Sequence, residues 1–167
     1  MTEKQQNDVL TDWLGRYKAL LFKIVRSYAF TPMDRDDLFQ EITVQLWRSI
    51  PSFRGECAVT TWLYRIALNT AIRFSQREKK QSRNRTDLDD AHHVLIETDG
   101  DRHDKLSWLY SEIAKLNEID RSICLLLLEG FSYKEMAGII GITESNIGVR
   151  INRVKKYLID QSKEYEF

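Results

Sequence analysis

The chain has few of the residues that break helices, since its 167 residues include only 7 glycines and 2 prolines. So few turn-forming residues argue against an all-β fold, in which short strands alternate with turns. Apolar residues recur instead at the three- and four-residue spacing of amphipathic helices. The sequence therefore predicts an all-α protein.

Cysteine and histidine are also scarce. The two cysteines, Cys57 and Cys124, are too few for a disulfide framework or a zinc site. Cys124 lies in an apolar run and is expected in the core, while Cys57 lies in a loop, where a redox role and a merely tolerated small side chain both stay open. His92, His93 and His103 lack partners at ligand spacing. We expect no metal and no cofactor.

Segments that target or span membranes are missing too. Residues 1–8 are polar and lack the apolar centre of a signal peptide. No apolar run approaches the roughly 20 residues that cross a bilayer. We therefore expect a cytoplasmic protein.

The formal net charge is zero, but the charge is unevenly distributed. Residues 1–85 carry a net charge of +6, residues 86–106 carry −5, and the segment 62–85 holds seven cations and one acid. A solvated helix face would explain such a run. The aromatic residues beside it favour a site for a polyanion, partly balanced by the acidic block.

The helical spacing divides the chain into two parts. Helices are expected at 9–28, from about 34 or 36 to 50, and from about 60 to 77 or beyond, within a domain of residues 1–81. Residues 82–105 read as a flexible acidic linker with a short helix near 91–96. A second domain, 106–162, and a tail, 163–167, complete two small helical domains.

The second domain carries the pattern of a helix-turn-helix. Helices at 106–116 and 120–129 precede a capping box, Ser132 to Glu135. The helix that it starts stops at Gly141, and Thr143 caps a last helix that reaches about Ile159.

The last helix has two different faces. Ile147, Ile151, Val154 and Leu158 form the stripe expected to be buried. The opposite face could be an ordinary polar surface, but its side chains can also read base edges and hold phosphates. These are Ser145, Asn146, Val149, Asn152, Arg153 and Lys156.

A glycine-containing loop, 53–61, leads into the third helix. On that helix the stripe Leu63, Ala67, Thr70 and Phe74 is expected in the core, and a second stripe carries the polar and aromatic groups Trp62, Arg65, Asn69 and Arg73. Aromatic and amide groups beside cations suit unstacked bases on a phosphate backbone. The alternative is that Phe53 and Trp62 are simply core residues.

On the helix from Asp36, the residues Phe39, Ile42, Leu46 and Ile50 form the core stripe. The residues alone indicate a solvated surface for its far face, which carries Asp37, Gln40, Glu41, Val44 and Arg48.

The motifs together resemble the extracytoplasmic-function (ECF) sigma factors of bacterial RNA polymerase over nearly the whole chain. The segments that carry the resemblance are 37–47, 53–69, 116–121, 129–137 and 140–153. The resemblance implies a helix that docks on core polymerase through Asp37, Leu38, Gln40, Glu41, Gln45 and Trp47. It implies −10 element contacts from Phe53, Arg54, Gly55, Glu56, Cys57, Ala58, Trp62, Arg65, Asn69 and Arg73, and −35 contacts from the last helix, including Arg150.

The same resemblance implies the partners and the activity. The protein would be a non-catalytic initiation factor that binds the β′ clamp and β flap of core RNA polymerase and promoter DNA, and an anti-sigma factor would regulate it. Many relatives carry a basic or hydroxyl residue where this chain has Gly148 and Val149. The resemblance therefore implies DNA binding by the last helix without specifying its −35 preference.

Two other classes of protein are alternatives to a sigma factor. A conventional repressor or activator would have a ligand pocket in its N-terminal half and would bind duplex DNA without polymerase. A nucleic-acid enzyme would need convergent carboxylates or a nucleophile constellation. The acids at 34–37 are clustered, but no second basic residue and no metal-binding partner appears with them.

Overall fold

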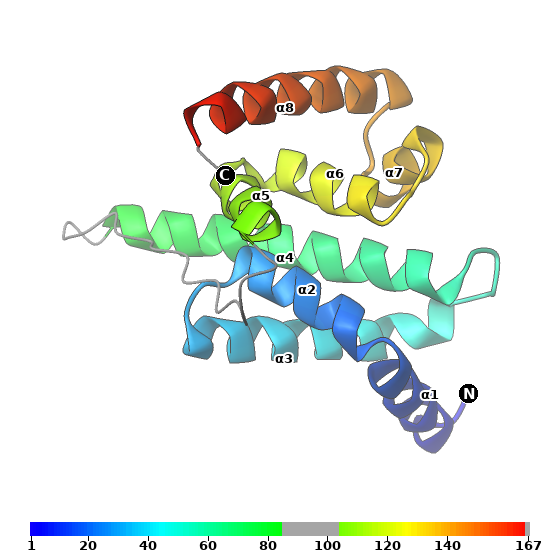
Figure 1. Ribbon diagram of the computed structural model, residues 1–167. Helices are drawn as coiled ribbons and strands as arrows, with labels where there is room; N and C mark the ends of the chain where they lie inside the picture. Colours follow the sequence, from blue (N-terminus) through cyan, green and yellow to red (C-terminus); the bar gives the residue numbers. More distant parts are fainter. Residues whose placement is uncertain (85–103, 166–167) are drawn as a thin grey trace. The chain divides into compact units, whose positions relative to one another are not determined.

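The computed structural model describes residues 1–84 and 104–165, and in these residues every regular element is a helix (Figure 1). The chain divides into two compact units between Leu88 and Asp89. The predicted fold class, two small all-α domains, is confirmed for the described residues.

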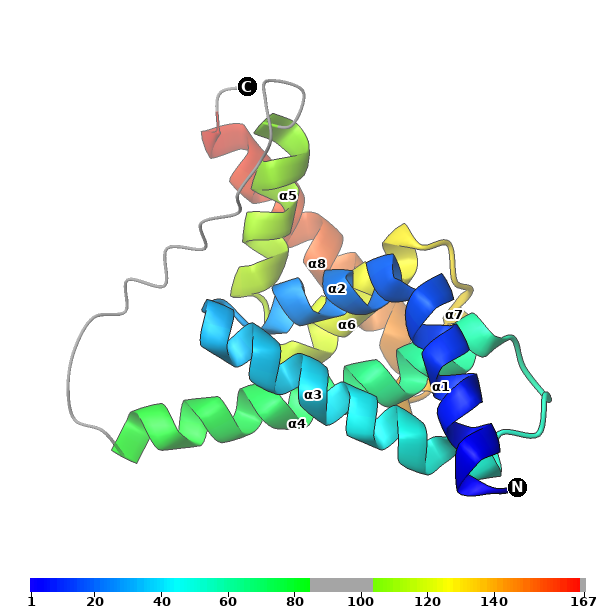
Figure 2. The ribbon, with the colours of Figure 1, turned by 90° about the horizontal axis from the view of Figure 1, so that it is seen from below.

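The first domain consists of helices α1 (Glu3–Arg16), α2 (Lys18–Tyr28), α3 (Pro32–Ser49) and α4 (Val59–Asn84), with a 3-10 turn η1 (Ile50–Ser52) after α3. The helices α3 and α4 lie side by side, and α2 packs on both (Figures 1 and 2). The N-terminal helix α1 contacts α3 and η1.

The core of this domain forms where the three apolar stripes meet. Leu63, Ala67, Thr70 and Phe74 of α4 are all buried, as predicted. They face fully buried residues of α2 and α3, among them Leu21, Ile24, Leu38, Ile42 and Leu46. Each such leucine or isoleucine contributes about 1.5–3 kcal/mol by leaving water, so this contact fixes which faces of α3 and α4 remain outside.

The single helix predicted at 9–28 is wrong, because two helices occupy this region. A capping box, in which the Thr2 hydroxyl accepts from the Gln5 amide and the Gln5 side chain accepts from the Thr2 amide, starts α1 at Glu3. Tyr17, at φ −113° and ψ 22°, separates α1 from α2. Gly15, a weak helix former, lies two residues before this break.

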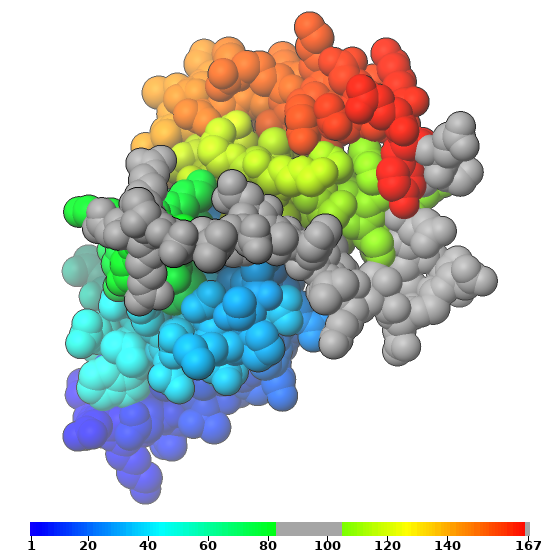
Figure 3. Space-filling view, turned by 90° about the vertical axis from the view of Figure 1, so that its left-hand side faces the viewer, coloured from blue at the N-terminus to red at the C-terminus, as the bar shows by residue number. Residues whose placement is uncertain are grey.

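The second domain consists of α5 (Asp104–Lys115), α6 (Glu118–Leu128), α7 (Tyr133–Ile140) and α8 (Glu144–Glu164). The predicted capping box of Ser132 and Glu135 is confirmed, as are the left-handed stop at Gly141 (φ 86°) and the Thr143 cap. Helix α8 continues past the predicted end near Ile159. Its orange-to-red atoms line one side of this domain (Figure 3).

Polar side chains fix the second domain from within. The guanidinium of the buried Arg121 donates to the carbonyl oxygens of Ala114 and Leu116, both at 2.8 Å, and so satisfies the end of α5. The Tyr157 hydroxyl of α8 donates to the buried Glu112 of α5 at 2.8 Å. Burial and this hydrogen bond raise the pKa of Tyr157 to about 12, which keeps its donor proton in place.

Part of the predicted linker lies outside the described residues, including the short helix near 91–96 and His92, His93 and His103. Helix α4 continues to Asn84 and so overlaps the start of that segment. The boundaries 1–81, 82–105, 106–162 and 163–167 stay predictions.

The turn between α7 and α8 offers a paired stability test at Gly141 and Gly138. An added Cβ meets no atom within 4 Å at either position, but only Gly141 has a positive φ. We expect Gly141→Ala to lower the free energy of unfolding by about 1 kcal/mol and Gly138→Ala, inside α7, to raise it by about 0.5–1 kcal/mol. Chemical denaturation of the full chain measures both, and changes of the same sign would contradict the assignment.

Candidate nucleic-acid and polymerase interfaces

The entrance to α4 is held by a cluster of three aromatic side chains. The Phe53 ring lies with its centroid 5.4 Å from that of Trp13 and 5.4 Å from that of Trp62. The Trp62 indole N–H also donates to the Ser49 hydroxyl at 3.1 Å. Phe53 and Trp62 are therefore half-buried supports that join α1, η1 and α4, as well as candidates for base contact.

The loop that this cluster supports is open to solvent. All five residues after Phe53 are exposed, namely Arg54, Gly55, Glu56, Cys57 and Ala58. Gly55 has φ 72° and no atom within 4 Å of an added Cβ, so the backbone turns outward here without a covering side chain. Amide groups of such a loop are free to approach a ligand closely.

The outward face of α4 continues from this loop. Arg65 and Arg73 are exposed, and Asn69 between them is half-buried. Since residues three, four and seven apart share one side of a helix, the structure brings Trp62 and these three side chains onto one face. An amide between two cations can pair with a base edge while the cations hold phosphates.

A polar groove of about 580 Å³ lies between α3 and the end of α4. Its α3 side includes four of the six residues that the family resemblance implied for polymerase contact: Asp37, Gln40, Glu41 and Gln45. On the α4 side, the Arg77 guanidinium donates to Glu41 at 2.7 Å and lies 5.9 Å from the centroid of the Phe74 ring.

The other two implied residues lie elsewhere. Leu38 is fully buried in the core, so its side chain is not at the surface for a partner in this structure. Trp47 faces α1, because its indole N–H donates to the Asn7 side chain at 2.7 Å and its carbonyl oxygen accepts from Gln6 at 2.6 Å. The family resemblance implied both as contact residues, and a motif match by itself does not separate the faces of α3.

The last helix, α8, presents the predicted polar face. Ile147, Ile151 and Val154 are buried and Leu158 is partly buried. The opposite residues Ser145, Asn146, Val149, Asn152, Arg153 and Lys156 are all exposed. Arg150 differs from them, since its guanidinium donates to Asp120 of α6 at 2.8 Å.

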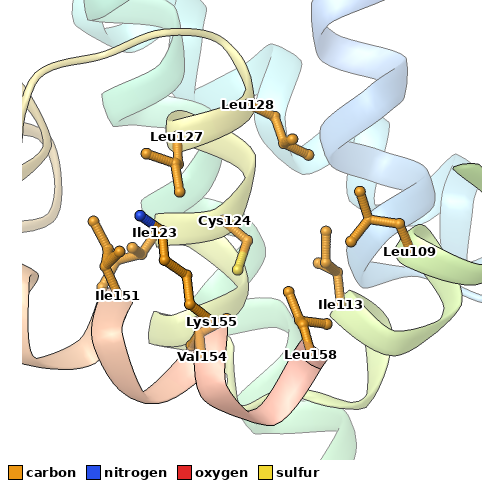
Figure 4. Close-up of a pocket in the computed structure, with 10 residues that line it drawn as sticks. All are labelled: Leu109, Ile113, Ile123, Cys124, Leu127, Leu128, Ile151, Val154, Lys155 and Leu158. Atoms are coloured by element: carbon orange, nitrogen blue, oxygen red, sulfur yellow. The ribbon is translucent and has the colours of Figure 1, made fainter. Parts of the chain in front are cut away.

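An apolar pocket of about 60 Å³ opens between α5, α6 and α8 (Figure 4). The Cys124 sulfur lies there among the carbon atoms of Ile113, Val154 and Leu158, and the half-exposed Leu128 lies at the pocket as well. The lining exposes almost no polar atoms. The pocket therefore suits an apolar side chain and is not a candidate catalytic site.

Three residues of these surfaces were not among the site residues predicted from the sequence. Val44, which is 45% exposed, and Arg77 complete the α3–α4 groove, and Asp120 binds Arg150 from another helix. Helical spacing places Val44 on the far face of this helix with Glu41, but Val44 was not predicted as a contact residue. The two ion pairs join distant positions, which no local pattern reveals.

Comparison with known proteins assigns both domains. Residues 13–81 match the family described as Sigma-70 region 2, and residues 106–158 match Sigma-70, region 4. The chain is 32% identical over 160 residues to the ECF RNA polymerase sigma-E factor of Haemophilus influenzae, covering 87% of this chain and 82% of that protein. The chain belongs to the ECF sigma factors.

Other relatives agree. The RNA polymerase sigma factor YlaC of Bacillus subtilis is 29% identical over 143 residues, covering 78% of this chain and 80% of that protein. Two solved structures share the fold with a TM-score of 0.66: CnrH in complex with the cytosolic domain of CnrY (20% identity, 98% and 96% coverage), and RpoE in complex with the anti-sigma factor NepR from Bartonella quintana (24% identity, 93% and 97% coverage).

The protein is thus an RNA polymerase sigma factor, which binds core polymerase and promoter DNA in transcription initiation and is not an enzyme. Within the described ranges, no three His, Cys, Asp or Glu side chains are grouped to hold a metal ion. In the same residues, no helix has both the length and the apolar composition needed to cross a membrane.

The two cysteines provide a test of these environments. Cys57 is exposed, whereas Cys124 is buried. Burial, and to a smaller extent the nearby charge of Asp120, raises the pKa of the Cys124 thiol to about 12. A raised pKa keeps the thiol protonated and unreactive at pH 8. We expect dithiobis-nitrobenzoate to modify one thiol per native chain, a reaction that Cys57→Ser removes, and the second only after unfolding. Equal reactivity of both thiols in the native protein would contradict this.

Proposed function

We propose that this sigma factor divides its work among three surfaces. The α3–α4 groove binds core polymerase, the loop 54–58 with the outward face of α4 captures the −10 element, and the exposed face of α8 reads the −35 element. The observation that carries the proposal is the exposed Gly55 loop, held by the Phe53 aromatic cluster beside the face of Arg65, Asn69 and Arg73.

The chemistry of the −10 surface suits single-stranded DNA. Stacking on an aromatic or apolar wall stabilises an unpaired base by about 1–3 kcal/mol, and the loop lies directly beside Trp62. Because Phe53 and Trp62 also pack on each other, we assign them to the wall and support of the pocket. Asn69 supplies the groups that pair with the base, and the exposed arginines supply the charge that holds the backbone.

The chemistry of the groove suits a basic partner helix. Asp37 and Glu41 place carboxylates at an open surface with an exposed Val44 between the polar groups. A surface that combines charged groups with an apolar contact is typical of specific protein interfaces. We therefore assign this surface to the β′ clamp, and the second domain to the β flap by resemblance.

The cellular location is inferred from the polymerase partner, and the regulation from the complexes formed by proteins of the same fold. We place the protein in the cytoplasm, where the polymerase that it binds transcribes DNA. Two structures of the same fold are named as complexes, one with the cytosolic domain of CnrY and one with the anti-sigma factor NepR. This supports the proposal that an anti-sigma factor controls the present chain.

Promoter opening tests the −10 assignment through Asn69. A promoter is first found by run-off transcription of a genomic library with purified core polymerase. We expect Asn69→Ala to lower open-complex formation on that duplex by roughly 2- to 10-fold, the equivalent of one hydrogen bond, while core binding stays unchanged. Transcription from a promoter with a pre-opened −10 bubble should recover most of the loss. Equal transcription from the duplex by wild type and variant would count against the assignment.

Trp62 separates support from contact in the same assay. Trp62→Phe retains an aromatic ring against Phe53 but loses the hydrogen bond to Ser49, whereas Trp62→Ala removes both. If the ring forms the wall of the pocket, the alanine variant should open the promoter at least several-fold less well than the phenylalanine variant. Equal defects would assign the residue to the Ser49 hydrogen bond instead.

Charge reversal tests the groove. We expect Asp37→Lys with Glu41→Lys to weaken association with core polymerase by tenfold or more, since like charges would then face a basic partner. Asp8→Lys with Asp12→Lys makes the same charge change on exposed positions of α1 and should leave the affinity nearly unchanged. Fluorescence titration of labelled sigma factor with core polymerase measures both, and equal affinities for the two double variants would refute the assignment.

A further inference from the structure

Among the described residues, Arg150 is the one member of the candidate −35 set whose side chain is held by another helix. Its Nη1 donates to Oδ1 of Asp120 at 2.8 Å, and the two side chains are only 24% and 14% exposed. The partner carboxylate is itself fixed, because Asn117, the cap of α6, donates to Oδ2 of Asp120 at 2.8 Å and accepts from the Asp120 amide at 2.9 Å. Arg150 is therefore anchored to the start of α6.

The same guanidinium fixes a side chain that faces outward. The Nε of Arg150 donates to Oδ1 of Asn146 at 3.1 Å. An arginine carries only donors, so the amide oxygen, and not the nitrogen, must point toward it. Asn146 lies in the first turn of α8 and is exposed, and the orientation therefore leaves its NH₂ group toward solvent.

This orientation matters for base recognition in the major groove. A free asparagine reads adenine with both halves of its amide, donating to N7 and accepting from the N6 amino group. With its oxygen turned toward Arg150, the Asn146 amide cannot present both halves to one base edge, and the group that faces outward is a donor. A donor suits O6 of guanine or O4 of thymine, because at that position of the groove adenine carries the N6 amino group, which is itself a donor.

We propose that Asp120 is a positioning residue that determines −35 specificity, although it lies on α6 and not on the recognition helix. Through Arg150 it holds the Asn146 amide with the donor outward, and the position that Asn146 contacts is read as guanine or thymine in preference to adenine. It also keeps Arg150 from the DNA backbone. The inference rests on the proposed role of α8 as the −35 reader.

The test uses holoenzyme reconstituted from the full-length chain and core polymerase, with a promoter library randomised across the −35 element. We expect wild type to prefer guanine or thymine at one position. Asp120→Ala should shift the ratio of those bases to adenine there by at least threefold toward adenine, because the Asn146 oxygen is released. Arg150→Met removes both hydrogen bonds and should cause the same shift at the same position.

Two further variants distinguish positioning from general loss of structure or charge. Asp160→Ala makes the same charge change as Asp120→Ala at an exposed position of the same domain and should leave the preference unchanged. Asn146→Asp still accepts from Arg150 but has no donor, so it should lose the guanine or thymine preference and gain cytosine, whose N4 group donates. Thermal melting of each variant checks that the second domain stays folded.

The outcomes separate this inference from the proposed function. A wild-type holoenzyme with no −35 preference would refute the assignment of α8 as the reader. A clear wild-type preference that Asp120→Ala and Arg150→Met both leave intact would overturn the inference while the role of α8 stands. A shift in both variants at the position that Asn146→Asp also changes would establish it.

Discussion

The burial of one face of α4 is the constraint on which the first domain depends. Leu63, Ala67, Thr70 and Phe74 contact α2 and α3 from a continuous stripe, and a rotation of α4 that exposed any of them would cost about 1.5–3 kcal/mol per large side chain. The helix therefore has one orientation, and that orientation turns Arg65, Asn69 and Arg73 outward. It also brings Arg77 across to Glu41, so that one packing contact builds both the candidate −10 surface and the α3–α4 groove.

Features that depend on periodicity and on local capping could be predicted from the sequence. The buried stripe of α4, the Ser132 capping box and the Gly141 stop depend on local spacing and are confirmed, as is the stripe of α8 except for Leu158, which is partly buried. The capping signal at Thr2 and Gln5 is equally local, but it lies in a polar segment without an apolar stripe, so the start of α1 was not predicted. The break at Tyr17 has no comparable local signal, since apolar spacing continues through it.

Contacts between distant positions could not be predicted in this way. The family resemblance implied Leu38 and Trp47 as polymerase contacts, but only the neighbouring helices decide that Leu38 is buried and that Trp47 faces Asn7. The same holds for the pair of Asp120 and Arg150, which are separated by α7 along the chain. Residue type and spacing identify a candidate surface. The residues of the neighbouring helix determine which side-chain atoms of that surface remain free to contact another molecule.

The two intramolecular ion pairs at the candidate surfaces differ in how readily a charged group of a binding partner can replace one of their members. The side chains of Arg77 and Glu41 are 56% and 40% exposed, and pairs in such positions contribute only about 0–1 kcal/mol. A basic group of a partner can therefore replace Arg77 on Glu41 at little cost. Asp120 and Arg150 are far less exposed, and removing one member of such a pair leaves a poorly solvated charge behind. The groove is consequently a surface where charges can be exchanged on binding, whereas the pair behind α8 keeps its geometry and so can hold a neighbouring side chain in one orientation.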